Sequence, residues 1–118
     1  MTNPFKDQEK FMRACDQTVG EVNYQQYQLY KNLIEEEFNE LKSANSSLEE
    51  LDALIDILVV TIGAIHSKGA NAEGAWNEVM RTNLAKIDPV TGKVRKREDG
   101  KVLKPEGWTP PDLEPYLK

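Results

Sequence analysis

Carboxylates gather on facing flanks of two neighbouring predicted helices. In the helix predicted over residues 24–43, Glu36, Glu37 and Glu40 lie on one flank beside the apolar stripe, because an α-helix turns by about 100° per residue. In the helix predicted over residues 48–67, Asp52 and Asp56 are one helical turn apart within a run of Leu, Ile and Val. Two antiparallel helices joined by a short turn would bring these carboxylates together.

Such a cluster needs a positively charged partner. Burying an ionised carboxylate costs several kcal/mol even after relaxation, and like charges a few Å apart repel each other. Lys42 is the only basic residue within the two acidic segments. Mg²⁺ prefers oxygen ligands, and Mn²⁺ can replace it. We therefore expect a magnesium site, with Glu49 as an alternative ligand. The competing interpretation is that the acids of the helix over residues 24–43 form a solvated face.

Four predicted helices position these groups. They span residues 4–16, 24–43, 48–67 and 72–87. Ser47 and Glu50 form a capping box that opens the third helix. The third helix is apolar nearly all round, so we expect other helices to enclose it. The pattern predicts an all-α fold, an antiparallel four-helix bundle-like protomer.

The fourth predicted helix carries a polar residue on its apolar face. Asn83 lies there, with Lys86 beside it. A buried Asn needs hydrogen-bond partners, which a neighbouring helix end could supply. The functional alternative is that Asn83 holds a substrate phosphate or base while Lys86 neutralises phosphate charge.

The composition changes after residue 88. Residues 1–88 are expected to form the helical core, and residues 89–118 an extended, basic and proline-rich tail, packed on the same domain or on a partner protomer. The stretch KREDGKV has the turn chemistry of a short hairpin. Trp108 in the tail is either a docking anchor or a platform on which a base stacks.

Composition also limits the classes of partner. Fifteen basic and twenty acidic residues give a net charge of −5, which argues against a nucleic-acid partner. No apolar run approaches the length of about 18 residues that a membrane span needs. The N-terminal stretch lacks the apolar region of a signal peptide. We therefore expect a cytoplasmic protein with neither a membrane nor a nucleic-acid partner.

Four stretches together resemble a known family. They are EEFNE, ELDALIDILVVTIGA, VMRTNLAKID and GKVLKPEGWTPPDL. This order of elements is similar to that of the all-α nucleoside triphosphate pyrophosphohydrolases, the MazG-like group, and in particular to its phosphoribosyl-ATP pyrophosphohydrolase-like branch. The resemblance covers nearly the whole chain, and the combination is far more specific than the E-E-x-x-E pattern alone.

The resemblance implies a reaction and an assembly. The reaction is Mg²⁺-dependent cleavage of a nucleoside triphosphate between the α- and β-phosphates, giving a monophosphate and pyrophosphate. The assembly is a homo-oligomer, a homodimer or a homotetramer. Candidate substrates include dUTP, dCTP and damaged nucleotides, which would make the role one of nucleotide-pool housekeeping; phosphoribosyl-ATP itself is less favoured.

The family's motifs also suggest roles for individual residues. They carry over Glu36, Glu37 and Glu40 as sources of carboxylates, and Arg81, Asn83 and Lys86 as positions that contact the substrate. For the mechanism we expect Glu37, Glu40, Asp52 and Asp56 to hold the metal, and Glu36 to orient or deprotonate the attacking water or to bridge metal ions. The substrate-binding candidates are Arg81, Asn83, Lys86, Lys104 and Trp108.

One departure leaves the ligand set open. The family commonly has E-x-x-D in the third helix, but Ala53 occupies the Glu position if Asp56 is the Asp. Asp52 would then stand in, whereas the other register takes Glu49 with Asp52. We favour Asp52 with Asp56, because the apolar run after Asp56 matches better.

Two other classes compete with the enzyme. A di-iron bundle needs E-x-x-H motifs, and the chain has one His and no such motif. A non-catalytic acidic helical module for oligomerisation or binding remains the alternative.

Overall fold

The chain is helical throughout its ordered elements. A computed structural model describes residues 3–118. Its elements are α1 (Pro4–Ala14), α2 (Tyr24–Ser43), α3 (Ser47–Ser67), α4 (Ala72–Leu84) and a short 3-10 helix, η1 (Glu114–Tyr116). No strand is present within the described residues, where only isolated bridges occur. The predicted all-α class is confirmed, and the packing of the helices is compatible with a bundle.

These elements belong to two compact units. The acidic unit comprises the chain up to Ala72 together with Tyr116–Lys118, and the tail unit comprises Glu73–Pro115. The acidic unit holds 7 basic and 12 acidic residues, so it carries the whole net charge of −5, whereas the tail unit holds 8 of each. The division predicted from composition, after residue 88, stays a prediction.

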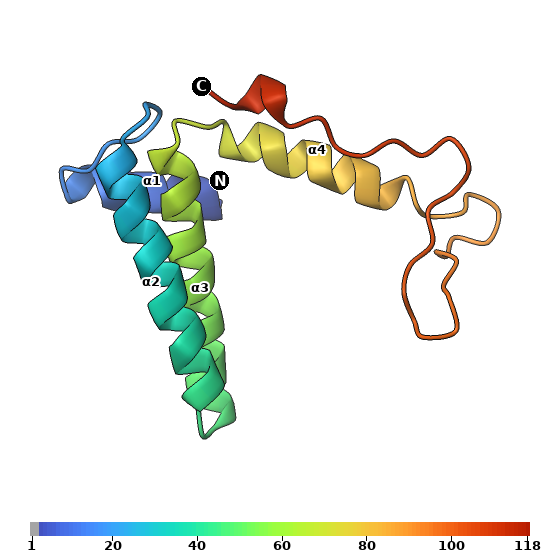
Figure 1. Cartoon of the computed structure of the whole chain (residues 1–118), viewed down its shortest axis with the longest axis horizontal. Helices are drawn as coiled ribbons and strands as arrows, with labels where there is room; N and C mark the ends of the chain where they lie inside the picture. Colours follow the sequence, from blue (N-terminus) through green and yellow to red (C-terminus); the bar gives the residue numbers. More distant parts are fainter. Residues whose placement is uncertain (1–2) are drawn as a thin grey trace. The chain divides into compact units, whose positions relative to one another are not determined.

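In the acidic unit, α2 and α3 run side by side in antiparallel directions, and α1 packs against α3 (Figure 1). Met12 of α1, Tyr30 of α2 and Ala64 of α3 form the buried core of this unit. Gly63, next to Ala64, is also buried and lies against the ring of Tyr30. The side of α3 that carries Gly63 therefore faces α2.

The helix boundaries differ from the prediction at three ends. Ser46, not Ser47, caps α3: its hydroxyl accepts a hydrogen bond from the Glu49 N–H at 3.1 Å. Both serines begin an S-x-x-E pattern because two glutamates are adjacent, so spacing alone could not choose between them. α1 ends at Ala14, because Asp16 adopts a positive φ of 59°. α4 ends at Leu84, three residues early.

The early end of α4 has a local cause. The Lys86 and Ile87 N–H groups donate to carbonyls three residues back, at 3.1 and 3.0 Å, which is the spacing of a tightened last turn. The residue before a proline disfavours the helical region, and Pro89 follows Asp88. The chain therefore leaves the helix before the tail begins.

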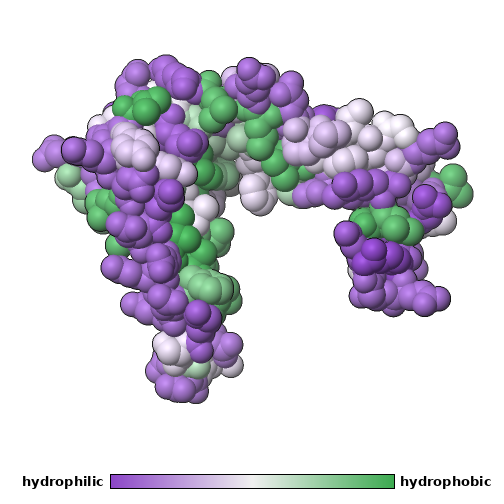
Figure 2. All heavy atoms as spheres, in the orientation of Figure 1, coloured by the Kyte–Doolittle hydropathy of each residue, from purple (hydrophilic) through white to green (hydrophobic). Residues whose placement is uncertain are grey.

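The expectation that other helices enclose α3 is wrong for the single chain. One stripe of α3 packs against α2 and α1, but a second apolar stripe is between 36% and 57% exposed; its members are Leu51, Leu54, Ile55, Leu58 and Val59. Figure 2 shows apolar side chains reaching the surface along the α2–α3 pair. We call these five residues the α3 stripe.

Candidate active site

Glu37 lies at the centre of the carboxylates on α2 and α3. Its side chain is half-buried, and its Oε2 atom is buried without a hydrogen-bond partner in the described part of the chain. Burial raises the pKa of Glu37 above the ordinary value of 4.5, and a side-chain hydrogen bond with Glu40 and the charges of Glu40, Asp56 and Asp52 raise it further. The neighbouring charges that shift this pKa are all negative.

The acidic groups of α2 and α3 differ in burial. Asp56 is half-buried on α3, and Asp52 is exposed one turn earlier. Glu40 is exposed one turn after Glu36, which is exposed as well. Because the charges of Asp52 and Asp56 both act on Glu37, the acidic flanks of α2 and α3 lie close enough to interact electrostatically.

Glu49 has another partner. Its Oε2 accepts a hydrogen bond from the Asn45 N–H at 2.8 Å, while its own N–H donates to Ser46. The side chain therefore helps to begin α3, where it satisfies a main-chain donor that the helix leaves open. This role favours the register that uses Asp52 with Asp56 over the one that uses Glu49.

The donor set can be tested against a divalent cation. Among residues 3–118, no group of three or more His, Cys, Asp or Glu side chains converges in a geometry that could hold a metal. The chemistry does fit, because all four groups supply carboxylate oxygens and Glu37 has a buried oxygen without a partner. Asp52 is exposed, so its side chain has room to rotate toward a bound ion.

In the tail unit, three of the predicted substrate-binding residues meet at one aromatic ring. The Nζ atoms of Lys86 and Lys104 lie 5.2 and 4.8 Å from the centroid of the Trp108 ring. The indole N–H of Trp108 donates to the main-chain oxygen of Thr82 at 2.7 Å. Trp108 thus anchors the tail to the end of α4, and two ammonium groups lie by its ring.

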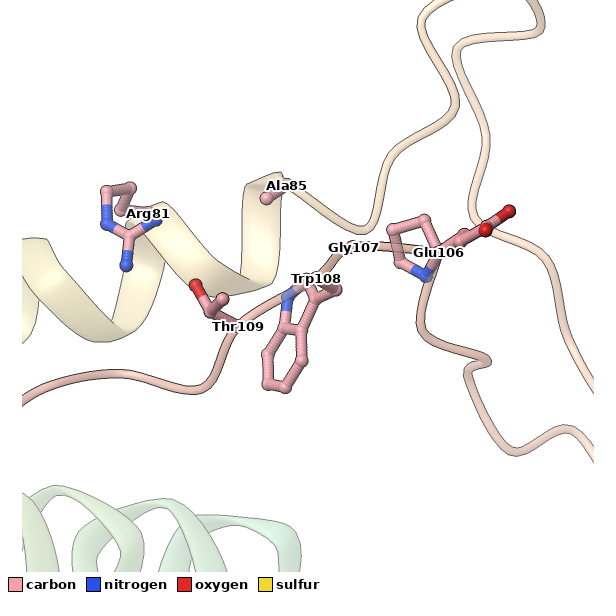
Figure 3. A pocket seen from close by; sticks show the side chains of 7 residues that line it. Arg81, Ala85, Glu106, Gly107, Trp108 and Thr109 are labelled. Atoms are coloured by element: carbon pink, nitrogen blue, oxygen red, sulfur yellow. The ribbon is translucent and has the colours of Figure 1, made fainter.

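Arg81 lines a pocket beside this anchor. The pocket has a volume of about 210 Å³ and lies between α4 and the tail; Figure 3 shows Arg81, Ala85 and Trp108 around it. The Arg81 guanidinium also donates to both carboxylate oxygens of Glu78, at 2.7 and 3.0 Å. Arg81 is therefore held in place by Glu78.

Glu78 is a structural residue that the sequence analysis did not single out. Its carboxylate accepts from Arg81 and from the Asp112 N–H, the latter at 2.8 Å. These hydrogen bonds lower its pKa to about 2, with Arg81 the larger cause. The i, i+3 spacing of Glu78 and Arg81 could have indicated the ion pair. Its contact with the tail, 34 residues further along the chain, has no local signal.

Asn83 is not buried, contrary to the prediction. It is exposed, and its Oδ1 accepts a hydrogen bond from Lys86 Nζ at 3.0 Å. The buried residue is its neighbour Thr82, which is 2% exposed, because the tail covers the Thr82 side of α4 through Trp108. The spacing of apolar residues predicts a buried side of α4 that lies one residue away from its true position, which corresponds to a rotation of about 100°.

Comparison with known families supplies the remaining observation. The sequence profile of the phosphoribosyl-ATP pyrophosphohydrolase family matches residues 6–83, which is more than half of the chain. The chain belongs to the phosphoribosyl-ATP pyrophosphohydrolase family. Membership implies a hydrolase that cleaves a pyrophosphate bond in a nucleotide-like substrate, and it confirms the resemblance noted from the motifs.

The extent of the match separates the candidate residues into two sets. All the acidic candidates on α2 and α3, together with Arg81 and Asn83, fall inside residues 6–83, whereas Lys86, Lys104 and Trp108 follow the matched segment. A search of curated proteins found no match to the chain. None of the helices in the described residues has the length and apolar character that crossing a membrane requires.

Proposed function

We propose that this protein hydrolyses a nucleoside triphosphate to the monophosphate and pyrophosphate, with Mg²⁺ as its cofactor and Mn²⁺ as a substitute. The observation that carries the proposal is Glu37, a half-buried carboxyl with an unpartnered oxygen and three acidic neighbours. A cluster of oxygen donors without a cation of its own is the arrangement that a hard metal ion with phosphate ligands satisfies. The family supplies the reaction class.

In this proposal each acidic residue has a role. Glu37, Glu40, Asp52 and Asp56 would hold the metal. When bound, the ion neutralises phosphate charge and makes water a better nucleophile near neutral pH. Glu36, exposed on α2, accepts the proton of the attacking water while the bond between a phosphorus atom and the bridging oxygen breaks.

The tail unit supplies cations in this proposal. Lys86 and Lys104 offset the charge of the leaving pyrophosphate, and Arg81 and Asn83 contact the phosphates. The Lys86 side chain already bonds to Asn83, which limits its freedom before substrate arrives. Trp108 holds Lys86 and Lys104 near each other, because both ammonium groups contact its ring. A base that stacked on this ring would compete with the two lysines for its faces.

The proposed assembly is a homodimer or homotetramer that covers the α3 stripe. Exposed apolar patches of this kind usually mark interaction surfaces, and homodimer interfaces are the most apolar ones. The proposed role is the removal of unwanted nucleotides from the cytoplasmic pool.

The test is a product assay with the purified full chain. Ribo-, deoxyribo- and modified nucleoside triphosphates and phosphoribosyl-ATP are incubated separately with Mg²⁺, and the products are separated by chromatography. Monophosphate and pyrophosphate from a nucleoside triphosphate, absent when EDTA replaces Mg²⁺, would support the proposal. Turnover of phosphoribosyl-ATP alone would contradict the substrate class, and diphosphate plus orthophosphate would contradict the cleaved bond.

A second candidate is a non-catalytic acidic binding module. The specific observation in its favour is that the carboxylates within residues 3–118 do not yet converge on a metal position. Absence of turnover on every substrate, together with no effect of Mg²⁺ on thermal stability, would favour this alternative.

A further inference from the structure

The tail unit contains a hairpin, residues 93–104, whose two arms have a defined register. Lys96 and Val102 form an antiparallel bridge at its centre. The Leu103 N–H donates to the Arg95 carbonyl at 2.8 Å on one side of the bridge. We call this segment the basic hairpin; it lies outside the part of the chain that the family profile matches.

The turn of the basic hairpin is fixed by Asp99. The Arg97 N–H donates to the Lys101 carbonyl at 2.8 Å, which closes the turn. The carboxylate of Asp99 accepts from the Arg97 guanidinium and, at 3.1 Å, from the Lys101 N–H. Arg97 holds the pKa of Asp99 below its usual range. The arms are thus held in position by local hydrogen bonds.

The basic hairpin concentrates positive charge. It has six basic residues and two acidic ones, a net charge of +4, so the rest of the chain carries −9. Only Arg97 forms an ion pair; within residues 3–118, no carboxylate pairs with the other five cations of the hairpin, all of them exposed: Lys93, Arg95, Lys96, Lys101 and Lys104. Unpaired cations held this close repel one another unless an anion binds between them.

Several of these cations share one side of the basic hairpin. Directly opposed residues of an antiparallel pair point to the same side, and neighbours along an arm alternate. Arg95, Arg97 and Lys101 therefore lie on the side opposite to Lys96. Arg95 also lines a second pocket, of about 260 Å³, together with Lys86 at the end of α4. The positive side of the hairpin is thus continuous with a pocket whose lining adds one lysine and two acidic residues, Asp88 and Glu106.

We propose that this side of the basic hairpin is a binding surface for a short chain of phosphates, with Arg95 and Lys101 as its principal contacts. Guanidinium groups match pairs of phosphate oxygens in geometry, and lysines add point charges. The phosphate chain could be the tail of a nucleotide or a free inorganic oligophosphate. The inference rests on the proposed function for the identity of the ligand, but binding requires neither hydrolysis nor metal.

A short oligophosphate fits this surface better than a nucleic acid. A long polyanion would extend beyond the 12-residue hairpin and meet the rest of the tail unit, which has 2 basic and 6 acidic residues and so a net charge of −4; this disfavours it electrostatically. A chain of two or three phosphates matches the reach of a few side chains. The surface would therefore select for the number of phosphates and not for a base.

The test measures binding of inorganic tripolyphosphate to the full chain by calorimetry, in EDTA so that neither metal binding nor hydrolysis contributes. We expect R95Q/K101Q to weaken binding by at least about tenfold, because it removes the two cations that would form charge-assisted hydrogen bonds with the phosphates. K6Q/K10Q is the matched control: it removes two exposed charges from α1 and should change the affinity less than about twofold. R95K/K101R should retain binding.

The outcomes separate this inference from the proposed reaction. Loss of binding in R95Q/K101Q alone supports the inference even if no triphosphate is hydrolysed. Failure of the wild-type chain to bind tripolyphosphate, or equal weakening in both glutamine variants, would overturn it whatever the product assay shows. A nucleoside triphosphate that displaces tripolyphosphate identifies the nucleotide tail as a ligand; if only pyrophosphate displaces it, the ligand is a free oligophosphate. A single-stranded oligonucleotide that binds more tightly than tripolyphosphate would overturn the oligophosphate assignment in favour of a nucleic-acid surface.

Discussion

Gly63 of α3 lies so close to Tyr30 of α2 that a side chain at position 63 would overlap the tyrosine ring. A Cβ placed there would be closer than 3.0 Å to three ring atoms. The ring cannot move away easily, since Tyr30 is buried and its hydroxyl donates to Gln17. The close approach of α2 and α3 at this point sets the distance at which the acidic flanks face each other.

Substitution of Gly63 therefore tests the helix pairing. We expect Gly63→Ala to destabilise the protein by about 1–3 kcal/mol, the usual range for overpacking. Chemical denaturation followed by circular dichroism measures the change. Gly92→Ala is the control for replacing a glycine where no neighbouring atom is near, although its positive φ of 70° adds some strain. An unchanged midpoint in Gly63→Ala would contradict the close pairing.

Metal-free stability should depend on Glu37. Glu37→Gln removes a charge that burial and its acidic neighbours disfavour, so the metal-free variant should unfold at a higher temperature than the wild type. Saturating Mg²⁺ should stabilise the wild type, by about 2.7 kcal/mol at a hundred times the dissociation constant, and the variant much less. Scanning calorimetry with and without Mg²⁺ measures both effects. An equal response of the two proteins to Mg²⁺ would rule out Glu37 as a ligand.

Docking of the tail onto α4 should weaken at low pH. The pKa of Glu78 falls from 4.5 to about 2 in the folded protein, so its stabilising effect is complete above the unfolded value and is lost as the pH falls from about 4.5 to about 2. Glu78→Gln removes this contribution. Melting temperatures of the two proteins should differ at pH 6 and converge near pH 2. A constant difference across this range would show that Glu78 does not titrate as described.

The α3 stripe should determine the oligomeric state. Leu58, 57% exposed, lies within the stripe, and a charge there would be buried in any interface that covers it. We expect Leu58→Glu to convert the wild-type dimer or tetramer to a monomer in analytical ultracentrifugation. Val90→Glu, at a residue 91% exposed in the tail, is the matched control and should leave the assembly intact. A monomeric wild type would contradict the proposed assembly.

The antiparallel pairing of α2 and α3 could be predicted from the sequence because its determinants are local. Spacing along one helix placed Glu37 and Glu40 on one flank, and the short turn before α3 left an antiparallel return as the simple arrangement. Gly63 lies on the same side of α3 as Asp56, and its lack of a side chain allows α3 to approach the ring of Tyr30 closely.

Other features could not be obtained from local patterns. Two adjacent S-x-x-E patterns compete at the start of α3, and only the contact between Glu49 and the Asn45 N–H distinguishes them. The buried side of α4 depends on the tail, because Trp108 covers Thr82 from 26 residues away. Apolar periodicity predicts that a stripe of a helix is buried, but it does not show whether the same chain or a partner protomer buries it.

In the proposed function, Glu37 and its acidic neighbours support Mg²⁺-dependent release of pyrophosphate. The most direct measurement compares pyrophosphate release from nucleoside triphosphates by the wild type, Glu37→Gln and Glu35→Gln, where Glu35 is an exposed acid on the other side of α2. Because outer partners of metal ligands already cost about 10–100-fold in activity, we expect Glu37→Gln to lose at least about a hundredfold. Glu35→Gln should stay within about twofold of the wild type. Equal activity in all three proteins would contradict the proposed role of Glu37 in the reaction.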